Sequence, residues 1–177
     1  HGCYHVQVTQ RDGERHSVAA AFLHPNLDRP NLDVRTGVHV TGLRFDGRRA
    51  TGVEYEGGDR TMVVRARREI VLSAGAFGTP QLLMASGVGP GAHLREHGIA
   101  PALDSPGVGQ NLQDHISAVV IFRSKPYEGT VGLTPGGVGT LLKGMWEWTR
   151  HRTGIITSCA AESGVYYRTS PDVEVAD

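Results

Sequence analysis

The sequence has few cysteines, no long apolar run and no excess of charge of either sign. Cys3 and Cys159 belong to no Cys-x-x-Cys pair, so we expect free thiols in a reducing, cytoplasmic compartment, with one disulfide as the alternative. No stretch approaches the run of about 18 apolar residues that marks a transmembrane segment, so none is expected. The 18 basic residues balance the 18 acidic residues, which leaves no broad field to attract nucleic acid or an anionic membrane.

The length of the chain limits how many domains it can hold. A chain of 177 residues, 39% of them hydrophobic, predicts one domain or one and a part, with a real core. No signal peptide is recognisable. Because the chain opens at His1 without a methionine, we expect an internal fragment or a processed piece of a longer protein.

The most informative stretch is a strand-like segment followed by small residues and a helix signal. Residues 69–73 are largely apolar and β-branched, with no charge after the first residue, which predicts a short buried strand. Residues 74–76 are small, Thr79 is expected to cap a helix that starts at Pro80, and Gly87 should end it. Such a turn can present free N–H groups to an anion, although the same unit more often serves only as architecture.

A β-rich region precedes this stretch. Residues 38–45, 51–55 and 61–67 form three strand-like segments, joined by turn signals at Asp46-Gly47 and Gly57-Gly58. We therefore predict a meander of antiparallel strands. Its arginines alternate with apolar residues and lack interleaved aromatics, which favours a solvated sheet face over nucleic-acid contact.

Two further elements are expected later in the chain. Residues 116–122 predict a buried strand, and residues 138–152 predict an amphipathic helix. Trp146 and Trp148 lie on the apolar side of this helix, and we expect both to pack in a core.

One motif points to a different chemistry. His93-Leu-Arg-Glu96-His97 matches the H-x-x-E-H pattern of inverted zinc peptidases, because two histidines four residues apart share a helix face. The segment is short, closed by Gly98 and Pro101, and has no clear third ligand. Surface histidines are the favoured interpretation, and a zinc hydrolase remains a remote alternative.

Two blocks of sequence resemble a known family. Residues 75–89 contain a small residue, Thr79-Pro80, two aliphatic residues and a closing Ser-Gly-Val-Gly, and they resemble the second signature of the glucose–methanol–choline (GMC) flavoprotein oxidoreductases. Residues 106–115, Pro-Gly-Val-Gly-Gln-Asn-Leu-Gln-Asp-His, look like the next block of that family. Most of the match is of the choline-dehydrogenase-like bacterial type.

The resemblance implies a fold and a division into domains. The fold class is α/β (α+β): part of an FAD/NAD(P)-binding Rossmann-like domain with an antiparallel β-meander, then the start of a sheet-and-helix substrate domain. Residues 1–105 would belong to the FAD-binding domain, without its N-terminal G-x-G-x-x-G unit. Residues 106–177 would form the cover over the flavin and the first part of the substrate domain, without the catalytic C-terminal part.

The resemblance also assigns FAD as the cofactor and names the residues that hold it. Val40 would touch the adenine, largely through its backbone, although from its strand alone it is better interpreted as a core valine. Ser73, Ala74 and Gly75 would line the dinucleotide, because bulkier side chains would hold the nucleotide away from the backbone. Asn111 would bind the cofactor from the cover segment.

Glu162 is the implied substrate-binding residue, since the family's choline-oxidising members place a carboxylate there on a substrate-domain strand. A carboxylate hydrogen-bonded within the sheet is an equally common alternative. Asp114 and His115 could suggest acid–base catalysis, but adjacent residues seldom converge on one reacting atom. The family's catalytic histidine lies near its C-terminus, so we name no catalytic residue in this chain.

The implied activity is FAD-dependent oxidation of a small-molecule alcohol to an aldehyde or ketone, by hydride transfer to the flavin. The electrons would pass to oxygen or another acceptor, and a dehydrogenase is favoured over an oxidase. A non-catalytic, truncated remnant is the alternative. We expect this chain alone to bind FAD weakly or not at all.

Overall fold

The computed structural model describes residues 2–120, 134–159, 161–172 and 174. These residues form two compact units, which we take separately. The meander unit comprises residues 34–119, and the ribbon unit comprises residues 1–33 and 120–177. The division of the family fold at residue 105 stays a prediction.

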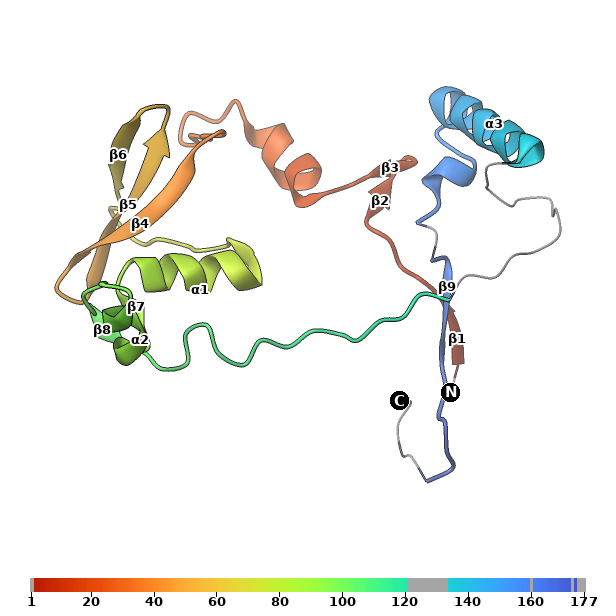
Figure 1. Ribbon diagram of the computed structural model, residues 1–177. Helices are drawn as coiled ribbons and strands as arrows, with labels where there is room; N and C mark the ends of the chain where they lie inside the picture. The colour runs from red at the N-terminus through yellow and green to blue at the C-terminus, as the bar shows by residue number, and fades with distance from the viewer. Residues whose placement is uncertain (1, 121–133, 160, 173, 175–177) are drawn as a thin grey trace. The chain divides into compact units, whose positions relative to one another are not determined.

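The meander unit is built on a three-stranded antiparallel sheet. Strands β4 (His39–Asp46), β5 (Arg49–Gly57) and β6 (Arg60–Arg65) follow one another in chain order (Figure 1). Gly47 and Gly58 occupy the two tight turns with φ of 55° and 65°, a region that favours glycine. The predicted meander and both of its turn signals are therefore confirmed.

Helix α1 (Gly75–Ala85) begins five residues before the predicted start, so the predicted cap at Thr79 is wrong. Thr79 lies inside the helix, and its Oγ1 accepts a hydrogen bond from the backbone N–H of Ala74 at 3.0 Å. This hydroxyl thus satisfies a backbone donor at the helix start, and Pro80 lies in the helix interior. Gly87, at φ 86°, ends the helix as predicted.

The predicted buried strand at residues 69–73 is absent. The segment has no strand geometry, and Val71 is 77% exposed. The predicted strand at residues 116–122 also fails over residues 116–120, which are exposed and irregular; its last two residues lie outside the described residues. A strand needs a hydrogen-bonded neighbour, and no described strand pairs with either segment.

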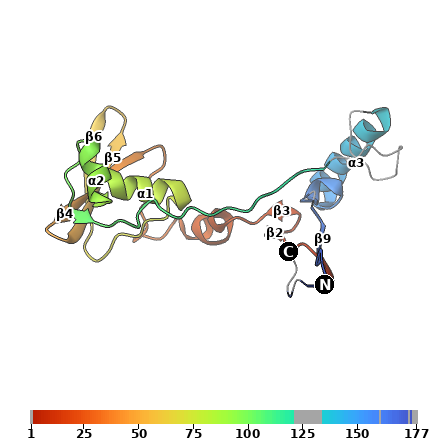
Figure 2. The ribbon, with the colours of Figure 1, turned by 60° about the horizontal axis from the view of Figure 1, so that its bottom comes forward.

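The C-terminal end of α1 is attached to β4 through Ser86. Its Oγ accepts a hydrogen bond from the backbone N–H of Leu43 at 2.8 Å and donates one to the carbonyl of Leu82 at 2.6 Å. Figure 2 shows α1 against the sheet from another side. One hydroxyl therefore joins the helix to the middle of a strand.

A smaller group of elements follows α1 in the chain. Strands β7 (Val88–Gly89) and β8 (Leu103–Asp104) pair in parallel, and helix α2 (Gly91–Glu96) lies between them in the chain. Leu94 of α2 is almost fully buried, with 1% of its surface exposed. The Asp104 carboxylate accepts a hydrogen bond from the N–H of Gly91 at 2.9 Å, which fixes the start of α2.

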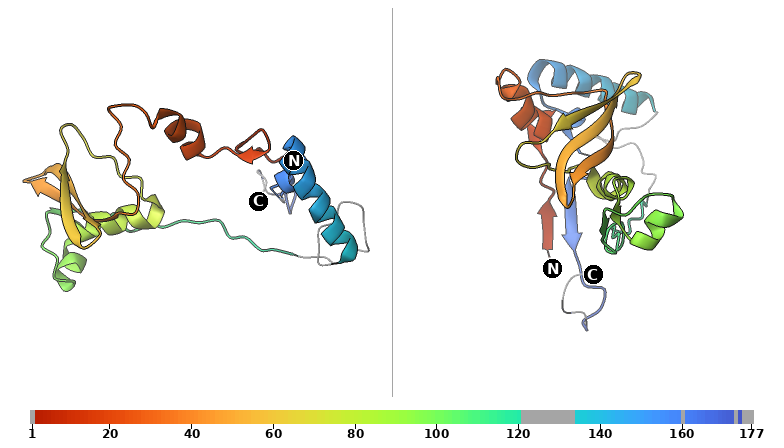
Figure 3. Two further views of the ribbon diagram at one scale, coloured as in Figure 1. Left: turned by 90° about the horizontal axis from the view of Figure 1, so that it is seen from above. Right: turned by 90° about the vertical axis from the view of Figure 1, so that its left-hand side faces the viewer.

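In the ribbon unit, a strand near the start of the chain pairs with a strand near its end. Strand β1 (Gly2–His5) is antiparallel to β9 (Ser163–Tyr166), and the two lie side by side in Figure 3. Cys3 faces Val165 across this ribbon, and both Cys3 and Cys159 are exposed free thiols. The alternative of one disulfide is therefore not formed.

Helix α3 (Pro135–His151) starts three residues before the predicted helix, capped by Thr134. Trp148 is half-buried, and its indole N–H donates to the carbonyl of Gly13 at 2.9 Å. Trp146 is 60% exposed, so the prediction that it packs in a core is wrong. No helix in the described ranges combines the length and apolar character needed to cross a membrane.

The remaining elements of the ribbon unit are short. They are β2 (Gln10–Arg11), β3 (Glu14–Arg15), the helical turns η1 (Ala19–Leu23) and η2 (His24–Asn26), and η3 (Ile155–Thr157). Strands β2 and β3 form a hairpin around the turn predicted at Asp12 and Gly13. The Arg152 guanidinium ties this hairpin to the end of α3 through an ion pair with Glu14 at 2.9 Å.

Candidate functional site

The small-residue bend, residues 73–75, lies open to solvent. Ser73, Ala74 and Gly75 are all exposed. Gly75 has φ 83°, and no heavy atom lies within 4 Å of the position that a Cβ would occupy. The protein's own side chains therefore do not cover the bend.

The bend leads directly into the N-terminal end of α1. The first turn of α1 carries no acidic residue, so the partial positive charge of the helix end is not neutralised there. At residues 73–76 a dinucleotide would meet no side chain larger than serine. The N–H of Ala74 is bonded to Thr79, so its phosphates would face the first backbone N–H groups of α1, which have no partner within the helix. The residues present thus fit such a group by size and by charge.

A groove of about 230 Å³ runs beside α1. It is lined by Ala76, Phe77, Pro80, Gln81, Met84, Gly109, Gln110 and Leu112. A Cβ on Gly109 would lie 3.2 Å from the methyl carbon of Met84, so the turn at residues 106–109 packs closely on the helix. Asn111 follows this turn with a left-handed backbone, φ 54°. The groove therefore brings the Asn111 segment next to the helix that carries the bend.

Phe77 and Met84 line this groove but were not among the residues predicted for the site. They are seven residues apart, which is two helical turns, and this spacing places them on one face of α1. The spacing indicates a shared face only for a helix that includes Phe77, and the predicted helix began at Pro80.

Val40 lies beside an irregularity in β4. It pairs with Tyr55, while Gly42 pairs with Glu54, so Thr41 is an extra residue that forms a β-bulge. Bulges redirect side chains and are common next to functional sites. Val40 is exposed, with 38% of its surface accessible, so it is not the core valine that its strand alone suggested.

Tyr55, which faces Val40 across the sheet, is 5% exposed. Its hydroxyl accepts a hydrogen bond from Arg35, whose guanidinium carbon lies 5.7 Å from the centre of the Tyr55 ring. The segment that enters β4 is therefore anchored close to Val40.

Glu162 belongs to the ribbon unit and lies one residue before β9, not within that strand as predicted. Its backbone carbonyl accepts a hydrogen bond from the N–H of Val6 at 3.0 Å, which extends the ribbon. Within the described part of the chain, no hydrogen bond or ion pair holds its exposed carboxylate. The alternative of a carboxylate bonded within the sheet is therefore not what this structure shows.

The other polar candidates gain no support. The His93 and His97 rings lie edge to face at 4.6 Å, but no group of three or more His, Cys, Asp or Glu in the described ranges could hold a metal ion. The Asp114 carboxylate accepts a hydrogen bond from the backbone N–H of His115 at 2.8 Å, a contact between adjacent residues. The zinc hydrolase alternative thus has no site in the part of the chain that the structure describes.

Sequence comparison finds one matching family, described as GMC oxidoreductase, over residues 1–117. An alcohol dehydrogenase [acceptor] of Pseudomonas putida is 43% identical over 168 residues, which are 94% of this chain and 30% of that protein. An oxygen-dependent choline dehydrogenase of Sinorhizobium medicae is 41% identical and covers 97% of this chain and 30% of its own length. The chain thus spans about 30% of the length of these relatives.

Solved structures give the same fold. An FAD-dependent oxidoreductase from Chaetomium thermophilum superposes with a TM-score of 0.74 at 27% identity, covering 93% of this chain and 30% of that one. A formate oxidase superposes with a TM-score of 0.72 at 28% identity, covering 93% and 28%. The predicted fold class, a partial Rossmann-like FAD-binding domain with helices and antiparallel strands, is confirmed by these neighbours.

Proposed function

The chain belongs to the GMC oxidoreductase family, and on that premise we propose that it supplies the surface on which the FAD of an alcohol-oxidising enzyme lies. FAD is the cofactor of this family. One observation carries the proposal: the bend at Ser73, Ala74 and Gly75 is exposed, small and directly followed by the N-terminal end of α1. Nothing in the meander unit stands between that bend and a ligand.

Three places in the meander unit would hold the cofactor. The bend would take the dinucleotide along its backbone, the bulged segment at Val40 would contact the adenine, and Asn111 would reach it from the turn beside α1. The hydrogen bonds of Ser86 support this arrangement, because they fix α1 against β4. When bound, FAD supplies the acceptor for a hydride.

Membership of the family supports the reaction that we propose. A small-molecule alcohol would be oxidised to an aldehyde or ketone, and the electrons would pass to oxygen or to another acceptor. The Pseudomonas relative is named as an alcohol dehydrogenase with an acceptor, which supports a dehydrogenase. We assign no catalytic base to these residues, and we place the whole enzyme in the cytoplasm, as the free thiols predict.

Glu162 would contact the substrate. Its carboxylate is exposed and holds no partner among the described residues, so it is available to a ligand. A negative group of this kind favours an alcohol that carries a positive charge, and the choline dehydrogenase relative supports that class.

A non-catalytic remnant is the second candidate. Val71, Ile116 and Val119 were expected in buried strands, but they are exposed by 77%, 103% and 85%. Apolar segments without strand partners tend to associate with one another. A remnant would therefore form concentration-dependent oligomers and show no nucleotide binding at the bend.

A direct test is the affinity of the isolated 177 residues for ADP, measured by calorimetry on the wild type and on Ala74→Leu. We expect Ala74→Leu to weaken binding about ten-fold or more, because a branched side chain holds the nucleotide away from the backbone. The control is Ala92→Leu, the same exchange at an exposed position of α2. Equal affinities for all three proteins would contradict the proposal.

A further inference from the structure

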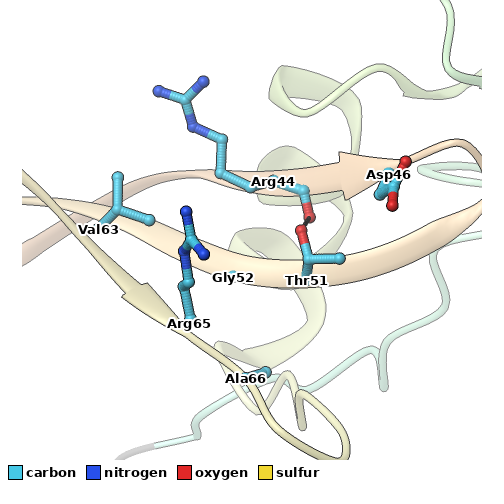
Figure 4. Close-up of a pocket in the computed structure, with 7 residues that line it drawn as sticks. All are labelled: Arg44, Asp46, Thr51, Gly52, Val63, Arg65 and Ala66. Atoms are coloured by element: carbon cyan, nitrogen blue, oxygen red, sulfur yellow. Dashed lines mark hydrogen bonds between the residues drawn. The ribbon is translucent and has the colours of Figure 1, made fainter.

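A row of three residues crosses the β4–β5–β6 sheet on the side shown in Figure 4. Arg44 of β4 pairs with Gly52 of β5, and Gly52 pairs in turn with Arg65 of β6. Neighbouring strands lie about 4.8 Å apart, so the two arginines start about 10 Å apart across a position with no side chain. Figure 4 shows both side chains extending to the same side of the sheet.

The space between these arginines is open. A hollow of about 610 Å³ lies over Gly52, and its lining also includes Thr51, Val63 and Ala66. A Cβ on Gly52 would lie 2.8 Å from the carbonyl oxygen of Val64, closer than a real Cβ can approach. The central position of the row therefore cannot carry a side chain that would fill the hollow.

The two arginines at this hollow differ in whether an acidic side chain neutralises them. Arg44 is held by Glu54 in an ion pair of 2.6 Å, which fixes its guanidinium and leaves its other N–H donors available. The Arg65 side chain makes no hydrogen bond or ion pair to another described residue. Asp46 is the acidic residue in the lining, and it lies towards the far end of β4 in Figure 4.

We propose that this arginine row is a binding site for a phosphate-type oxyanion, with Arg65 as its principal contact and Arg44 as the second. A phosphate group offers enough oxygens to accept forked hydrogen bonds from two guanidinium groups approaching from opposite sides. A carboxylate has only two oxygens, which suit one such fork. The anion could come from free phosphate or from a larger phosphate ester, since the shared chemistry is the same.

The alternative is a solvated face that simply keeps the sheet soluble. Such a face would hold its arginines independently, and exchanging any one of them for a neutral residue would have the same small effect. At a specific binding site, the affinity for the anion instead depends on Arg65 and not on other arginines of the same strand. Arg60, at the opposite end of β6, is therefore the matched control.

The test is a titration of the isotopically labelled chain with inorganic phosphate, and separately with glycerol phosphate, at constant ionic strength set with sodium chloride. We expect saturable amide shifts centred on Gly52 and Arg65, with an affinity that falls at least five-fold in Arg65→Gln and less than two-fold in Arg60→Gln. A response to glycerol phosphate alone would identify an ester as the ligand, and a response to both would identify free phosphate as sufficient.

Two results would overturn the site. One is the absence of saturable shifts at Gly52 and Arg65 with either anion. The other is an equal loss of affinity in Arg65→Gln and Arg60→Gln, which would indicate unspecific attraction. Both results concern the arginine row only, so they leave the ADP measurement at the small-residue bend as a separate test of the proposed function.

Discussion

At the scale of single residues, Ser86 holds two elements of the meander unit together. Its hydroxyl satisfies the backbone N–H of Leu43 in β4 and the carbonyl of Leu82 in α1. The hydroxyl is half-buried, so the N–H left behind by its removal would be poorly hydrated. Such an unsatisfied donor destabilises more than the average hydrogen bond stabilises.

We therefore expect Ser86→Ala to lower the free energy of unfolding by about 1–2 kcal/mol, measured by urea denaturation. Ser73→Ala is the control, because Ser73 is exposed and makes no bond to another described residue. An effect of Ser86→Ala no larger than that of the control would show that α1 is not held in this way.

Tyr4 reports on the ribbon unit through its ionisation. Its ring stacks on Tyr166 at 5.1 Å, and the hydrogen bond between the two hydroxyls raises the pKa of Tyr4 above the ordinary value of 10.0. The raised pKa means that the folded ribbon binds the proton more tightly than the unfolded chain does. The contribution to stability is thus present below pH 10 and is lost as the pH rises through the pKa of the folded state.

We expect Tyr166→Phe to bring the pKa of Tyr4 back towards its ordinary value, followed by the ring signals of labelled tyrosine during an alkaline titration. Tyr167→Phe, at the next position, should leave the titration of Tyr4 unchanged. A Tyr4 titration that does not respond to Tyr166→Phe would exclude the hydrogen bond as the cause.

At the scale of elements, the start of helix α1 differs between the sequence-based prediction and the structure. The Thr-Pro pair is a common start signal, and it predicted a helix from Pro80. The helix begins at Gly75 instead, and the Thr79 hydroxyl accepts a hydrogen bond from the N–H of Ala74 at its start. Pro80 consequently lies where a helix interior is normally destabilised by a missing N–H and a ring clash.

The exchange Pro80→Ala distinguishes the two helix starts. We expect it to raise the free energy of unfolding by about 1–3 kcal/mol and to increase helicity by circular dichroism, because the interior position regains its hydrogen bond. Gln81→Ala, at the exposed position next to it, should change stability by less than about 0.5 kcal/mol. A neutral or destabilising Pro80→Ala would favour the start that the sequence predicted.

The meander and the two absent strands show which elements a sequence can predict. The meander was predictable because its strands are joined by two-residue turns that begin at Gly47 and Gly58, so each strand pairs directly with its neighbour. Residues 69–73 and 116–120 have the composition of buried strands, but composition supplies no partner. Both segments are exposed and unpaired in the described residues, so whether such a segment forms a strand depends on a partner strand that its own composition does not specify.

At the scale of the whole molecule, the candidate residues fall in two units. Val40, the bend and Asn111 lie in the meander unit, and Glu162 lies in the ribbon unit. The resemblance to the family names these residues as candidates from the sequence, and their roles in binding stay predictions. The bulge at Thr41 and the groove lined by Phe77 and Met84 could not, because both depend on strand register and on packing between distant segments.

The most direct test of the central claim is a titration of the isotopically labelled 177-residue chain with FAD, following every backbone amide. We predict weak binding, with dissociation constants on the order of a millimolar, and shifts concentrated at Val40, Asn111 and residues 73–75. Shifts that avoid the bend, or firmly retained flavin with the amides of residues 73–75 unchanged, would contradict the account.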